Sequence, residues 1–63
     1  NRALRALRPE FSQRTWQAFE QVALRDLPPK EVAAALGLSL NAVYVAKSRV
    51  LKRLREELEG LME

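Results

Sequence analysis

The stretch Pro29–Leu54, PKEVAAALGLSLNAVYVAKSRVLKRL, decides which fold the sequence predicts. Pro29 suits the first position of a helix, because its missing N–H would have no partner there in any case. Gly37 can adopt the left-handed conformation that ends a helix and turns the chain. Ser39 is a good N-cap for the helix that follows. The stretch therefore predicts a short helix, a three-residue turn and a long helix.

Two further helices are predicted upstream, so the whole chain is expected to form one all-α domain of three to four helices. Pro9 pushes Arg8 out of helical geometry and ends the first helix. Ser12 is placed to cap the second helix, and Phe11 and Trp16 are placed to pack against each other as a hydrophobic staple. The predicted helices cover residues 1–7, 12–25, 29–36 and 40–60.

Composition agrees with a small helical domain and limits its chemistry. The chain has 63 residues with no cysteine and no histidine, so disulfides and the usual zinc ligand sets are excluded. No apolar run approaches the roughly 20 residues needed to span a bilayer. We expect no enzyme, no cofactor, no metal and no membrane partner. Because the chain begins without methionine, we also expect it to be a fragment of a longer protein.

The net charge of +3 is unevenly distributed. The chain is acidic from Glu56 onward, whereas the segment from Leu40 to Arg55 has no acidic residue. The basic residues of that segment are Lys47, Arg49, Lys52, Arg53 and Arg55. A solvated helix surface would explain such a run on its own. Its coincidence with the long predicted helix favours a polyanionic partner.

At 100° per residue, the long helix has two different sides. The core side carries Val43, Ala46, Val50 and Leu54. The opposite side carries Asn41, Tyr44, Val45, Ser48, Arg49 and Lys52. Asn41 can contact adenine, Val45 can contact a thymine methyl group, and Arg49 and Lys52 are better placed for phosphates. For Tyr44 and Val45, packing on the first helix or on a partner subunit is the alternative.

The other helices are predicted to complete the core and to leave one basic ridge in solvent. The ridge consists of Arg2, Arg5 and Arg8, for which phosphate contact is the alternative to simple solvation. The predicted core residues are Trp16, Phe19, Val22, Ala23, Leu27, Val32, Ala33, Leu36 and Leu38.

One family shares these motifs. The run EVAAALGLS at 31–39, followed by Ala42-Val43 and by the basic run Lys47–Arg55, resembles region four of the extracytoplasmic-function (ECF) sigma factors. This region is the C-terminal promoter-binding domain within the sigma-70 family. The lead-in Arg8–Phe19 is also similar to that of some members. The resemblance implies a helix-turn-helix fold, related to winged-helix DNA-binding domains without a wing, in the cytoplasm of a bacterium.

The resemblance also implies partners and contacts. Such a domain reads the minus-thirty-five element of double-stranded promoter DNA, docks on the beta-subunit flap of RNA polymerase core, and can be sequestered by an anti-sigma factor. By position, the residues implied to face bases and nearby phosphates are Ser39, Leu40, Asn41, Tyr44, Val45 and Ser48. Those implied to face the DNA backbone are Lys30, Arg49 and Lys52. Many members carry basic or hydroxyl residues at Tyr44–Ala46, so the base preference does not transfer.

Two other functions fit the sequence. One is the DNA-binding domain of a response-regulator or quorum-sensing type activator, which normally dimerises through a terminal helix. Leu58, Leu61 and Met62 could serve that purpose, although the long predicted helix leaves no separate dimerisation helix. The other is a protein-interaction module that keeps the fold without binding DNA, which the acidic end and the non-basic Tyr44–Ala46 support.

Overall fold

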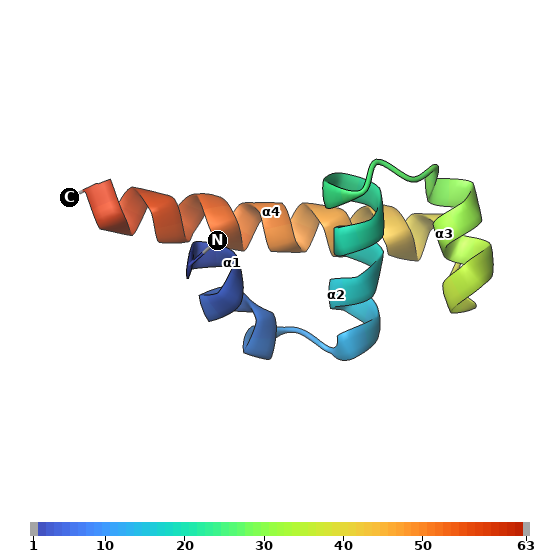
Figure 1. Ribbon diagram of the computed structural model, residues 1–63, viewed down its shortest axis with the longest axis horizontal. Helices are drawn as coiled ribbons and strands as arrows, with labels where there is room; N and C mark the ends of the chain where they lie inside the picture. Colours follow the sequence, from blue (N-terminus) through green and yellow to red (C-terminus); the bar gives the residue numbers. More distant parts are fainter. Residues whose placement is uncertain (1, 63) are drawn as a thin grey trace.

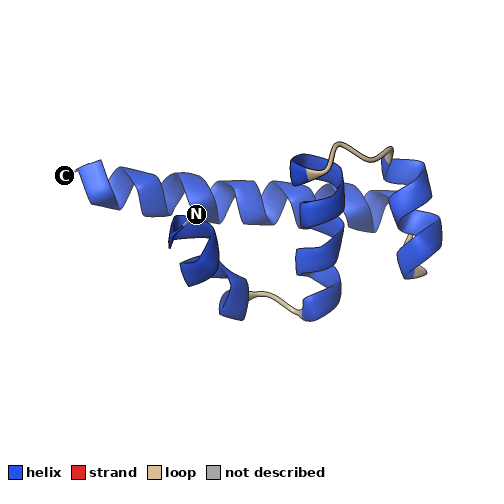
Figure 2. Ribbon diagram, viewed as in Figure 1, coloured by secondary structure: helices blue, strands red, loops and turns tan. Residues whose placement is uncertain are grey.

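The fold is built on one long helix, α4, which contacts each of three shorter helices. The computed structural model describes residues 2–62, with side chains through Gly60. Asn1, predicted in the first helix, lies outside this part. Figure 1 shows α4 running the length of the molecule with the other helices along it, and Figure 2 shows that only short loops join them. The helices are α1 (Arg2–Leu7), α2 (Gln13–Phe19), α3 (Pro29–Leu36) and α4 (Leu40–Met62). The all-α prediction is confirmed.

One side of α4 forms the core, as the helical periodicity predicts. Val43 and Val50 are fully buried, Ala46 is buried, and Leu54 is half-buried against the core. The first half of α4 packs with Ala18 of α2, with Val22 just after α2, and with Val32 and Ala33 of α3. Its middle packs with Leu7, Trp16 and Phe19. Every buried side chain in the described part is apolar, so burial of α4 is driven by the hydrophobic effect.

The turn between α3 and α4 has the geometry that its residues predict. Gly37 adopts the left-handed conformation with φ of 67°. The Leu38 N–H donates to the Ala33 carbonyl at 2.9 Å, which closes the end of α3. The Ser39 hydroxyl accepts the Ala42 N–H at 3.0 Å and caps α4. Pro29 occupies the first turn of α3. These bonds fix how α4 leaves α3.

The start of α2 also follows the prediction, with one correction before it. The Ser12 hydroxyl accepts the Thr15 N–H at 3.2 Å, and the Phe11 and Trp16 rings lie 6.4 Å apart as the predicted staple. The segment Arg8–Glu10, however, forms a 3-10 turn. The prediction that Pro9 expels Arg8 from helical geometry is therefore wrong. A proline in the first turn of a helical segment lacks only an N–H that needs no partner there.

The end of α2 departs most from prediction. Residues Glu20–Leu24 form a π-helical turn, and Asp26 has a positive φ of 56°. The Leu27 N–H then donates to the Gln21 carbonyl at 2.9 Å. Because the wider turn and the left-handed residue redirect the chain, Leu27 is 40% exposed. Its predicted place in the core is wrong, and Ala18, fully buried, was missed.

Candidate nucleic-acid interface

The side of α4 that faces away from the core is exposed, as predicted. Asn41, Tyr44, Val45, Ser48, Arg49 and Lys52 are all exposed. Within this set, Asn41, Val45, Ser48 and Lys52 follow one another at steps of four, three and four residues, so they form one strip along the helix. The strip begins with an amide, continues through a hydroxyl and ends with a cation. It offers hydrogen-bonding groups first and positive charge second.

The remaining predicted residues lie at the ends of this strip or on another helix. Leu40 is the first residue of α4 and is 37% exposed. Ser39 is exposed, but its hydroxyl oxygen accepts the Ala42 N–H. Lys30 is exposed in the first turn of α3. The structure thus brings together the residues of α4 and its cap, while Lys30 comes from the neighbouring helix.

Arg53 is the one cation of the basic run that the structure ties to another element. Its guanidinium donates to both carboxylate oxygens of Glu10, at 2.8 and 2.9 Å. It also lies 3.6 Å from Glu56 and 3.5 Å from Glu57. The hydrogen bond from Arg53 lowers the pKa of Glu10 below its ordinary value, while the hydrogen bond to Glu10 raises the pKa of Arg53. Arg53 therefore holds the turn after α1 against α4 and is not part of the exposed cationic strip.

Sequence reasoning missed the Glu10–Arg53 contact, although two signals point to it. Glu10 is the only acidic residue among the first 19 residues. Arg53 adjoins Leu54, so it sits at the edge of the core side of α4 rather than opposite it. An isolated carboxylate and a cation at the core edge form a natural pair once the helices pack. Their separation of 43 residues hides the pair from local patterns.

The first part of α4, up to Arg55, contains exposed cations and no acidic residue. No Asp or Glu occurs between Glu31 and Glu56. Arg49, Lys52 and Arg55 are exposed, and Lys47 is half-buried at the core edge, where a long side chain can carry its charge outward. This half of α4 is therefore positively charged, which favours an anionic partner.

Tyr44 is aligned with apolar residues rather than with the polar strip. Tyr44, Leu51 and Leu58 are separated by steps of seven residues, so they lie almost on one line along α4. Their exposed fractions are 49%, 37% and 46%. Tyr44 thus lies where the polar strip meets an apolar line. In the single chain neither Tyr44 nor Val45 is buried against α1.

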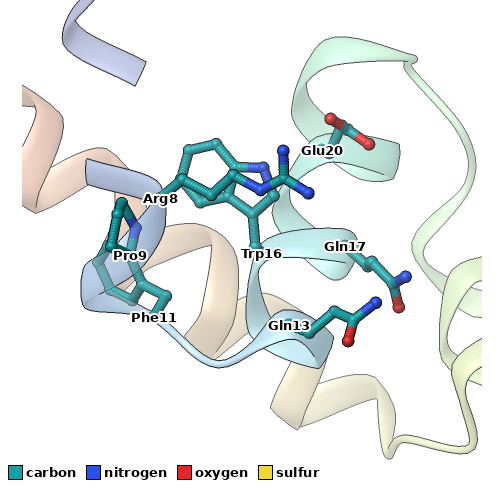
Figure 3. Close-up of a pocket in the computed structure, with 7 residues that line it drawn as sticks. All are labelled: Arg8, Pro9, Phe11, Gln13, Trp16, Gln17 and Glu20. Atoms are coloured by element: carbon teal, nitrogen blue, oxygen red, sulfur yellow. The ribbon is translucent and has the colours of Figure 1, made fainter. Parts of the chain in front are cut away.

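A second surface feature is a pocket of about 470 Å³ between the turn after α1 and α2. In Figure 3 the Arg8 side chain extends over the Trp16 indole toward Glu20. The lining residues are Arg8, Pro9, Phe11, Gln13, Trp16, Gln17 and Glu20. Trp16 is only 6% exposed, and its ring lies 5.3 Å from that of Phe19. Trp16 therefore serves the core, and the charged residues that line the pocket are one cation, Arg8, and one carboxylate, Glu20.

Neither a group of metal ligands nor a membrane-spanning helix is found among the described residues. Among residues 2–62, no three His, Cys, Asp or Glu side chains are grouped as metal ligands would be. No helix in that part combines the length and apolar composition needed to cross a membrane. Comparisons with protein-family models, curated proteins and solved structures found no match.

Proposed function

We propose that α3, the turn at Gly37 and α4 act as a helix-turn-helix that binds double-stranded DNA, with the first half of α4 in the major groove. The observation that carries this proposal is the division of α4. Val43 and Val50 are fully buried on one side, while the other side is polar, cationic and free of acidic residues up to Arg55. A helix about 10–12 Å across fits a major groove about 12 Å wide.

The order of residues along α4 suggests that some of them contact bases and others contact phosphates. Asn41 and Ser48, in the first turns, have the donors and acceptors that read base edges. Arg49 and Lys52, further along, have charges suited to phosphates, which supply affinity without sequence information. Lys30, exposed on α3, is a further phosphate contact in this scheme. Val45 lies between Asn41 and Ser48 on the strip and is 36% exposed, in the position of a contact to a thymine methyl group.

Within this class, we propose a role in transcription initiation, as the minus-thirty-five reading domain of a bacterial sigma factor. The resemblance of residues 31–55 and of the lead-in 8–19 to region four supports this role. RNA polymerase core, through its beta-subunit flap, and an anti-sigma factor are then the expected protein partners. A purified flap domain that binds this chain would support the sigma role, and one that does not would contradict it.

One observation favours a second function, that of an activator-type DNA-binding domain. Activators of that type dimerise, and the end of α4 exposes Leu51 and Leu58. In that case the DNA-binding half of α4 has the same role, but the chain binds as a dimer and has no affinity for the polymerase flap. DNA binding alone does not separate the two functions, whereas binding to the flap does.

The salt dependence of binding to a fluorescent DNA duplex tests the proposal. Each phosphate contact contributes a slope of about −0.9 to the plot of log affinity against log salt concentration. Contacts from Lys30, Arg49 and Lys52 predict a total slope of about −2 to −3. Selection from a pool of random duplexes should then enrich a common sequence. Affinity that does not change with salt would contradict phosphate contact, and a pool that stays random would contradict base reading.

A further inference from the structure

The last turns of α4 present an apolar face that the other described helices cover only in part, at Leu54. A hollow of about 430 Å³ on this face is lined by Leu51, Leu54, Arg55, Leu58 and Glu59. All of these residues belong to α4. Figure 1 shows the end of α4 projecting past α1, with no other helix beside its final turns. A second helix can therefore approach this face without displacing any part of the fold.

The leucines of this face have the spacing of a coiled-coil seam. Leu51, Leu54 and Leu58 are separated by three and four residues, which is the alternation that lets side chains of two helices interlock. The sequence continues the alternation at Leu61, whose side chain lies outside the described part. Leu51 and Leu58 are 37% and 46% exposed. A helix with the same repeat is therefore the natural complement of this face.

We propose that this face pairs with the same face of a second copy of the chain, with the two α4 helices antiparallel over residues 51–61. The charges beside the leucines favour a second copy as the partner and an antiparallel orientation of the two helices. In residues 52–55, Lys52 and Arg55 are exposed cations, while Arg53 is bonded to Glu10, and residues 56–59 include three carboxylates. When Leu54 of one copy packs beside Leu58 of the other in antiparallel helices, the basic segment of each copy lies beside the acidic segment of the other. A parallel pair would place like charges level with each other.

The geometry also sets the strength of the pairing and its relation to DNA binding. Eleven residues of helix make a contact about 17 Å long. The surface buried by so short a contact is smaller than that of a standard protein–protein interface. We therefore expect a weak dimer that is half-formed at roughly 0.1 mM. Asn41 and Ser48 lie outside the paired segment, so pairing does not cover these proposed base-reading residues, whereas Lys52, a proposed phosphate contact, lies within it.

Sedimentation equilibrium of the 63-residue chain tests the pairing. The mass should rise from 7.2 kDa toward twice that value between about 10 μM and 1 mM protein. Leu58→Gln should raise the dissociation constant at least tenfold. Leu24→Gln, which changes an exposed leucine on another element, is the matched control and should leave it unchanged. Circular dichroism checks that both variants stay helical. A mass of 7.2 kDa at every concentration, or an equal effect of the two variants, would overturn the proposal.

The orientation has its own measurement, because the chain has no cysteine. A single nitroxide label at Ser48→Cys should give a distance between copies of about 25 Å in the antiparallel pair and about 10 Å in a parallel one. The shorter distance would overturn the antiparallel arrangement. Duplex affinity of Leu58→Gln at low concentration keeps the two proposals apart. A variant that stays monomeric and still binds DNA supports both, whereas wild-type chain that dimerises without binding DNA contradicts only the proposed function.

Discussion

Arg53 shows how one side chain changes the role of a charged run. The sequence places Arg53 among five basic residues in the long helix, and all five are natural candidates for a polyanionic partner. Packing then commits Arg53 to Glu10, with two hydrogen bonds from a planar guanidinium to a carboxylate. The pairing joins residues 43 positions apart. It holds the turn after α1 against α4, so Arg53 does not add its charge to the exposed cations of α4.

Glu10→Gln should lower the melting temperature at neutral pH. Because the pKa of Glu10 is lowered from 4.5 in the folded chain, its contribution to stability is present above pH 4.5 and is lost as the pH falls through the lowered pKa. The difference in melting temperature between variant and wild type, followed by circular dichroism, should therefore shrink in acid. Glu20→Gln removes one exposed carboxylate elsewhere and is the control. A difference that persists unchanged at pH 2 would contradict the linkage.

At the scale of elements, local residue patterns predict some boundaries well and others badly. Gly37 and Ser39 predict the turn before α4 because each acts on backbone groups a few residues away. Periodicity likewise predicts the buried side of α4. The π-helical turn at Glu20–Leu24 and the positive φ of Asp26 have no such local signal. The prediction that Leu27 belongs to the core is wrong because the π-helical turn and Asp26 redirect the chain just before it.

Substitutions at the two glycines test whether local backbone conformation determines the turn before α4. Gly37→Ala should lower the free energy of unfolding by about 1–2 kcal/mol, because Gly37 has φ of +67° although nothing lies within 4 Å of the added methyl group. Gly60→Ala is the matched control. Gly60 lies within α4 and also has open space around it, so alanine should raise stability by up to about 1 kcal/mol. Urea unfolding measures both. Equal effects of the two substitutions would mean that backbone conformation does not govern the turn.

At the scale of the whole molecule, α4 carries three different surfaces, and each is a task of this one helix. Its buried side joins two hydrophobic clusters, its first half offers a polar and cationic strip, and its end presents leucines. Sequence periodicity is sufficient to predict the first two tasks. The sequence also singles out Leu58 at that end, whereas the exposure of Leu51 is shown only by the packed structure. A dimer without affinity for the polymerase flap favours the activator function, and a DNA-binding chain that binds the flap favours the sigma function.

Charge reversal on α4 tests most directly whether this helix binds DNA. Arg49→Glu with Lys52→Glu changes the net charge from +3 to −1, since each substitution removes two units. Arg2→Glu with Arg5→Glu on α1 makes the same change and is the control. By fluorescence anisotropy with a labelled duplex, the α4 variant should lose at least 100-fold in affinity, and the α1 variant less than tenfold, while both keep wild-type helicity. Equal losses, or an α4 variant that binds as wild type does, would contradict DNA binding by α4.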